Sequence, residues 1–157
     1  MNVVRGLGVE AMRHKLMVLS LGAVALLGLT GCQASQASVG GQSPKSAVVR
    51  VIESEWHMNP SLASAPAGAV TFSVSNRGAI DHEMVILKTD LAGAALVQAS
   101  GENKIDEGAS GENMGEVQVA AGATGAGTFR LSPGHYVLIC NIPAHYQAGM
   151  VTDFAVN

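Results

Sequence analysis

The chain has 157 residues, of which 48% are hydrophobic and 13% charged, and its formal net charge is −3. Nine Lys and Arg against twelve Asp and Glu leave no basic excess to neutralise a phosphate backbone, so we expect no nucleic-acid partner. Two cysteines, one of which is assigned to a lipid below, leave no disulfide to stabilise the fold.

Residues 1–31 have the organisation of a signal peptide. Basic residues precede Leu16–Leu29, an apolar run too short to span a membrane readily. The run ends in Leu29-Thr30-Gly31-Cys32, which resembles the cleavage box of bacterial lipoproteins, where the cysteine receives a diacylglyceryl group. We therefore predict lipid attachment at Cys32 and anchoring to a membrane. The alternative is a plain secretory signal in which Cys32 falls by chance.

Residues 32–46 read as the lipidated cysteine and a flexible tether rich in Ser, Ala, Gly and Gln. Cleavage before Cys32 would change the net charge to about −5, because three basic residues and one acidic residue are removed. Gln33 is not the Asp that resembles an inner-membrane retention signal. We therefore predict an extracytoplasmic protein, anchored at the outer membrane of a two-membrane bacterium or on the outer face of a single membrane.

Residues 47–157 are enough for one domain and not two. Val70, Phe72 and Val74 alternate with hydroxyl residues between positions 69 and 76, which is the period of a half-buried strand. Similar short segments are 49–51, 82–88, 127–131, 135–140 and 151–156, and only 91–99 has a weak helical pattern. Short strands separated by turn signals predict an antiparallel β-sandwich or barrel.

An acidic stretch at residues 99–116 contains the one internal repeat, in which residues 99–103 recur as residues 109–113. Five carboxylates face a single Lys104 there. We interpret the stretch as a solvated polar loop, and a docking surface for a basic partner is the alternative. The carboxylates lack the alternate-position spacing of a calcium loop.

Cys140, His145 and Met150 follow one another at intervals of five residues, beginning at the end of the predicted strand 135–140. A thiolate, two imidazoles and a distant thioether form the blue-copper donor set, in which His₂Cys lies in a plane and Met is a weak axial ligand. The loop supplies three of these four ligands, so a second histidine is needed. His82, which opens another predicted strand, is the best candidate. An exported Cys140 without a disulfide partner also indicates a buried or metal-bound thiol.

Around these residues the chain resembles the cupredoxins, in particular the plastocyanin, azurin and sulfocyanin-like small blue copper proteins. Residues 68–82 are similar to the family's strand, turn and first-ligand segment, and residues 131–140 are similar to its run into the ligand loop. The resemblance implies a single-domain, all-β Greek-key β-sandwich. It also implies one copper ion, cycling between Cu(I) and Cu(II), with the ligands His82, Cys140, His145 and Met150.

Two positions depart from the family pattern. Glu83 follows the first histidine where many members have Asn, whose amide braces the ligand loop, but its backbone N–H is still available to the Cys140 sulfur. Ala144 precedes His145 in place of the usual Gly, which costs little unless that position requires a positive φ.

The resemblance implies a monomeric carrier of single electrons between redox proteins, and not an enzyme. An enzyme would need an open coordination position or a second metal site, and a dinuclear copper centre needs two cysteines in one loop, where only Cys140 is present. Family members commonly expose the edge of the loop histidine, so His145, ringed by Ile142, Pro143 and Ala144, is the predicted electron port. The alternatives are a periplasmic copper storage or delivery protein and a metal-free adhesion domain.

Overall fold

The structure is a computed structural model that describes residues 46–157, all of which belong to one compact unit. The predicted signal peptide, the predicted lipid site Cys32 and nearly all of the predicted tether lie outside the described residues. No helix within residues 46–157 is long and apolar enough to cross a bilayer.

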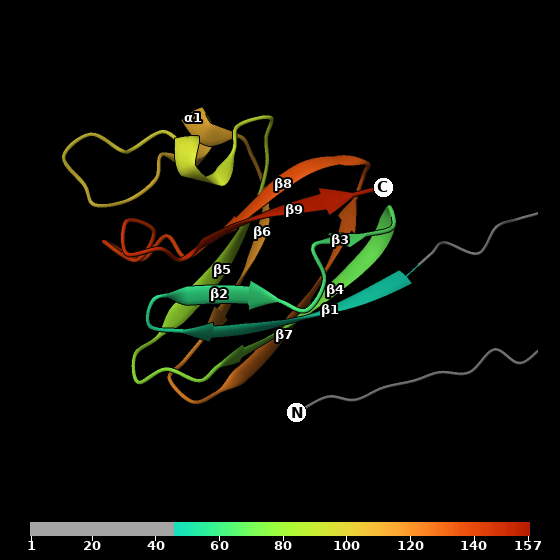
Figure 1. Cartoon of the computed structure of the whole chain (residues 1–157), viewed down its shortest axis with the longest axis horizontal. Coiled ribbons are helices and arrows are strands. Elements are labelled where there is room, and N and C mark those ends of the chain that lie inside the picture. Colours follow the sequence, from blue (N-terminus) through green and yellow to red (C-terminus); the bar gives the residue numbers. More distant parts are fainter. Residues whose placement is uncertain (1–45) are drawn as a thin grey trace, which may run out of the picture. The chain divides into compact units, whose positions relative to one another are not determined.

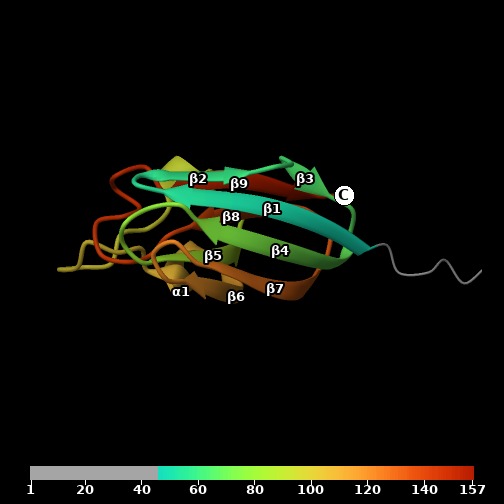
Figure 2. The same cartoon turned by 90° about the horizontal axis from the view of Figure 1, so that it is seen from below.

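Two β-sheets face each other and form the predicted all-β sandwich (Figures 1 and 2). The four-stranded sheet has the order β2-β1-β4-β7, and the five-stranded sheet has the order β3-β9-β8-β5-β6. Their bounds are β1 Ser46–Ser54, β2 His57–Pro60, β3 Ser64–Ala65, β4 Gly68–Asn76, β5 His82–Lys88, β6 Glu112–Val119, β7 Thr124–Leu131, β8 Gly134–Ile139 and β9 Val151–Val156. Pairing is mostly antiparallel, but β1 pairs with β4 and β3 with β9 in parallel.

The main core lies between the sheets. Val70, Phe72 and Val74 point into it from β4, as their alternation predicted, and each is fully buried. Burying such a side chain contributes roughly 1.5–3 kcal/mol. Phe154 of β9 packs edge-on against Phe72 with ring centroids 5.5 Å apart, which joins the two sheets at the centre of the core.

A second hydrophobic cluster involves β5 and β8 and the segment between β5 and β6. Four consecutive residues of β5, Met84–Leu87, are buried, so this strand is covered on both faces. Val85 and Leu87 pack with Leu96 and Ile105 of the β5–β6 connection. The stretch predicted as a solvated polar loop, residues 99–116, therefore contributes Ile105 to the cover of the sheet.

Two details of the sequence reading are corrected by the structure. The predicted helix at 91–99 is only the 3₁₀ turn η1, Gly93–Ala95. The second half of the acidic stretch is not a loop but the short helix α1, Glu107–Ser110, and the start of β6. The two repeat copies adopt different structures, because residues 99–103 form turns while residues 109–113 span the end of α1 and the start of β6.

Three connections gather at one end of the sandwich: the β1–β2 turn, the loop before β5 and the loop after β8 (Figures 1 and 2). The loop before β5 leads into His82, the first residue of that strand. The loop after β8 begins with Cys140, because β8 ends at Ile139. The fold therefore brings the predicted ligand segments to the same end.

Candidate metal centre

His82 is positioned by the sheet. It is the first residue of β5, where it pairs with Val119 of β6, and three residues later β5 pairs with the end of β8 through Val85 and Ile139. The imidazole is 1% exposed. Pairing with β6 fixes the backbone at His82 and pairing with β8 begins three residues later, so the direction of the His82 side chain is set by the strand.

The loop from Cys140 to Met150 folds back on itself through backbone hydrogen bonds. The Cys140 N–H donates to the Met150 carbonyl (3.0 Å), and the Met150 N–H donates to the His145 carbonyl (3.1 Å). A turn between them is closed by the His145 N–H, which donates to the Ile142 carbonyl (3.0 Å). The main chain of Met150 is thus bonded to both Cys140 and His145.

Three predicted ligands converge on one point. The Cys140 Sγ lies 3.2 Å from the His145 Nδ1, and the two Nδ1 atoms of His82 and His145 are 3.3 Å apart. The donor atoms of the three residues all lie within 4.8 Å of one another, and all three side chains are buried. Met150 is fully buried and belongs to the core cluster that also contains Cys140.

The donor set fits a copper ion. One sulfur and two imidazole nitrogens, directed at one another inside the protein, are the soft and borderline ligands that copper takes in blue sites. Cys140 is a free, buried cysteine with no disulfide partner among the described residues.

Burial changes the protonation of the site. It raises the pKa of the Cys140 thiol to about 11, and the backbone N–H groups of Glu83 and Ile142 oppose the rise. The pKa of His82 is lowered by burial and then by His145, and burial also lowers the pKa of His145. Both imidazoles are therefore neutral at pH 7, as ligands must be, while the thiol loses its proton only when a metal binds.

The two departures from the family pattern have different outcomes. The backbone N–H of Glu83 does donate to the Cys140 Sγ, at 3.5 Å, as expected. Ala144, however, has a φ of 73°, so its position requires the left-handed conformation that favours glycine. The substitution at 144 therefore does cost stability.

Sequence reasoning missed the residues that surround the ligands. Asn141, next to Cys140, accepts from the Ile105 N–H (2.7 Å) and donates to the Ile105 carbonyl (3.1 Å) and to Glu107 (2.7 Å). The Trp56 ring meets the His145 ring edge-on, with centroids 5.0 Å apart. A polar residue immediately after the predicted cysteine ligand and the single tryptophan were the only signals in the sequence.

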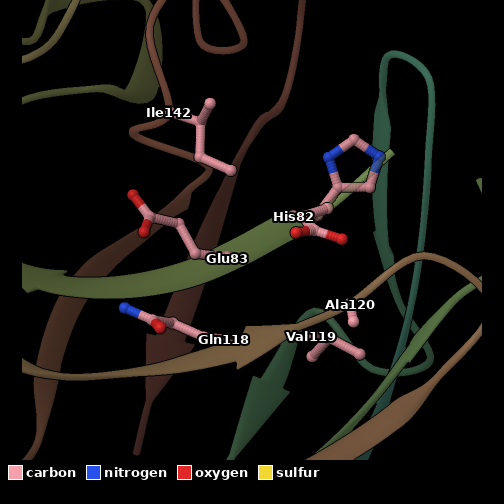
Figure 3. A pocket seen from close by; sticks show the side chains of 7 residues that line it. His82, Glu83, Gln118, Val119, Ala120 and Ile142 are labelled. Carbon is pink, nitrogen blue, oxygen red and sulfur yellow. The ribbon is translucent and has the colours of Figure 1, made fainter. Parts of the chain in front are cut away.

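A pocket of about 360 Å³ opens beside the site. His82, Glu83 and Ile142 line it together with residues of β6 and the turn after it (Figure 3). The Glu83 carboxylate is half-buried there, and its pKa is raised by burial and by Glu116. The pocket belongs to the surroundings of the metal centre.

A two-sheet β-sandwich with a buried His, Cys and His at one end defines a cupredoxin. The chain matches the sulfocyanin (SoxE) domain over residues 62–157, which is more than half of its length, and it belongs to that family. It is a blue copper protein whose cofactor is one copper ion.

Comparisons with individual proteins are consistent with this family and this fold. The chain is 32% identical over 111 residues to the copper-resistant cuproprotein CopI of Rubrivivax gelatinosus, a match that covers 69% of this chain and 65% of that protein. Auracyanin of Roseiflexus castenholzii has a TM-score of 0.53 and 21% identity, covering 73% of this chain and 99% of its own. Auracyanin B has a TM-score of 0.51 and 26% identity, covering 74% and 91%.

Proposed function

We propose that this protein carries single electrons between redox proteins outside the cytoplasm. In this proposal His82, Cys140 and His145 would hold the copper ion most strongly, and Met150 would be a weaker fourth ligand. The observation that carries it is the convergence of the three donor atoms within 4.8 Å at a buried end of the sandwich. When bound, copper supplies a Cu(I)/Cu(II) couple.

The surroundings of the ligands suit fast electron exchange. The ladders of β5 and the backbone bonds of the ligand loop restrict movement of the donor atoms, so little reorganisation accompanies a change of charge. The backbone N–H of Glu83 offsets part of the thiolate charge of Cys140. A fully occupied set of protein ligands leaves no position for a substrate, which favours a carrier over an enzyme.

Electrons would enter beside His145. This side chain is 6% exposed, and the half-exposed Trp56, at 41%, lies edge-on against it. Pro143 and Ala144 are exposed on the same loop, and Ile142 is half-buried. An apolar surface next to a ligand edge allows a partner to approach the site without displacing bound water from charged groups.

The test is the visible spectrum and voltammetry of the copper-loaded full chain. We expect an intense thiolate-to-copper band, a reversible one-electron wave, and loss of the band in Cys140→Ser. A colourless wild-type protein would overturn the ligand assignment, and an irreversible wave with loss of copper would overturn the carrier function.

Met150 has its own test as the fourth ligand. Met150→Leu roughly conserves volume, and such swaps usually cost less than about 1.5 kcal/mol in a core. The variant should fold, bind copper and stay coloured, while its reduction potential rises because the thioether no longer donates to Cu(II). An unchanged potential would mean that Met150 only packs.

A second candidate function is copper storage or delivery, which the name of the copper-resistant relative favours. The two functions differ in copper exchange. A carrier keeps copper in both oxidation states against a moderate chelator for hours, whereas a delivery protein releases Cu(I) to a competitor rapidly. The chelator experiment on the reduced protein decides between them.

The location outside the cytoplasm rests on the signal-like residues 1–31 and the lipoprotein-type Cys32. Labelling of growing cells with a radioactive fatty acid should mark the wild-type chain and not Cys32→Ser. Labelling of neither chain, with both exported, would indicate a plain secretory signal instead.

A further inference from the structure

The β1–β2 turn carries a carboxylate that organises the loop before His82. The Glu55 Oε1 accepts hydrogen bonds from the backbone N–H groups of Ala79 (2.7 Å) and Ile80 (3.1 Å). Gly78 leaves room for it, because a Cβ at that position would lie 2.5 Å from the same oxygen. The loop is therefore built around the Glu55 carboxylate.

His82 has one nitrogen that the metal centre does not use. Its Nδ1 faces His145, while its Nε2 is buried and has no hydrogen-bond partner among the described residues. The Glu55 Oε1 lies 3.9 Å from this Nε2. A buried ring N–H needs an acceptor, and histidine ligands of metals usually donate their second N–H to a carboxylate or a carbonyl.

We propose that Glu55 is a positioning residue of the copper site, whose carboxylate accepts the Nε2–H of His82. The bond keeps His82 in the tautomer whose Nδ1 lone pair points at Cys140 and His145. The observed 3.9 Å is longer than a hydrogen bond, and a closure of about 1 Å is needed. The Glu55 side chain is 31% exposed, so its carboxylate is not enclosed on all sides.

Other acidic groups near His82 do not fill this role. Asp81 is exposed, and its carboxylate accepts from the Ala121 N–H at 2.9 Å. Glu83 points into the pocket beside Ile142, away from the β1–β2 turn (Figure 3). Hydrogen bonds from its own backbone N–H and from that of Ala79 lower the pKa of Glu55, which keeps it an ionised acceptor.

The inference rests on the proposed copper ligands but not on electron transfer. It is tested with Glu55→Gln and Glu55→Met in the full chain. Both variants remove the charge, but only Gln retains an oxygen that accepts from His82 and from the loop. Asp81→Asn is the matched control, since it removes a neighbouring charge and retains its own acceptor.

Nitrogen-15 NMR of the histidines in the metal-free and Cu(I) forms reads the tautomer directly. Wild type, Glu55→Gln and Asp81→Asn should keep the proton on Nε2 of His82, and Glu55→Met should show a mixture. The Nε2–H proton resonance should move upfield in Glu55→Gln and stay in place in Asp81→Asn, because only the former changes the acceptor.

Copper affinity and potential complete the test. Glu55→Met should lose 10–100-fold in copper affinity by competition with a chelator, the usual effect of removing such a partner, and Glu55→Gln should lose less. Both neutral variants should raise the reduction potential, because a nearby negative charge favours Cu(II). A wild-type protein with the proton on Nδ1 would overturn the inference, as would an Nε2–H resonance that does not respond to Glu55→Gln. The NMR and affinity measurements do not depend on voltammetry. Failure of the electron-transfer proposal can therefore be distinguished from failure of the proposal for Glu55.

Discussion

The two segments that carry the predicted imidazole ligands are held in different ways. His82 opens β5, which has strand neighbours on both sides and four consecutive buried residues behind it. His145 lies in a loop without strand pairing, which is fixed by its own turns and by contacts with the β5–β6 connection. Asn141 and Tyr146 make those contacts, through Ile105 and the Gly93 carbonyl.

This difference separates global stability from the geometry of the site. A defect in the two sheets, which we call the strand half, weakens the whole sandwich, but the backbone ladder still sets the position of His82. A defect in the loop half, residues 140–150, removes fewer buried contacts but acts directly on the spacing of Cys140 and His145. Four predictions test this separation.

The largest effect on stability is expected in the strand half. Ile86→Ala removes a fully buried side chain of β5 from the core between the sheets, and such truncations cost roughly 2–5 kcal/mol. Denaturant unfolding should show this loss. The visible spectrum of the folded, copper-loaded variant should stay that of wild type, because the ladder that positions His82 is unchanged. A shifted spectrum would contradict the separation.

Glu53 of β1 is the polar exception within the strand half. It is fully buried, its two oxygens have no partner among the described residues, and burial and Glu83 raise its pKa to about 7 from 4.5. Between these two values the folded protein holds a proton that the unfolded chain releases. The free energy of unfolding should therefore fall by ~3 kcal/mol as the pH rises from about 4.5 through about 7.

Glu53→Gln should remove this fall, and the experiment compares denaturant unfolding of the metal-free proteins at pH 5 and pH 8. The lowered pKa values of His82 and His145 act in the opposite direction, but they are common to both proteins. The difference between the two proteins thus isolates Glu53. Glu102→Gln, an exposed control, should keep the wild-type slope.

In the loop half, Asn141→Ala should cost roughly 2 kcal/mol, because the buried N–H and carbonyl of Ile105 and the half-buried Glu107 carboxylate lose their partner. Its visible spectrum should also shift, since the residue adjoins Cys140. Asn113→Ala is the matched control: this exposed side chain donates to the same Glu107 carboxylate and should cost less than about 0.5 kcal/mol. Equal effects of the two changes would mean that the β5–β6 connection does not hold the ligand loop.

The smallest expected effect is a gain. Ala144 has a φ of 73°, which costs a residue with a Cβ roughly 1–2 kcal/mol, while glycine adds about 0.4–1 kcal/mol of unfolded-state entropy. Ala144→Gly should therefore raise stability by about 0.5–1 kcal/mol in thermal unfolding. Ala148→Gly, in the same loop but without a positive φ, should lower it. A loss in both variants would show that the backbone at 144 is not strained.

Much of the sandwich could be predicted from the sequence, most directly in strands that have one buried and one exposed face. The alternation of Val70, Phe72 and Val74 gave β4 correctly, because period two follows directly from the pleat. The prediction of a strand at residues 82–88 was also correct, although β5 is buried on both faces. The sequence reading missed β6, whose Glu112, Asn113 and Glu116 are exposed at the edge of the sheet.

By itself, the sequence determined the donor chemistry and the cysteine, histidine and methionine spacing of the ligand loop, because side-chain chemistry and chain distance are local properties. It also determined that His82 opens a strand. The tertiary structure decided that His82 meets Cys140 and His145 within 4.8 Å, that residue 144 has a positive φ, and that Glu55, Trp56 and Asn141 surround the ligands. His82 and His145 are 63 positions apart in the sequence, and only the packing of the two sheets brings such residues together.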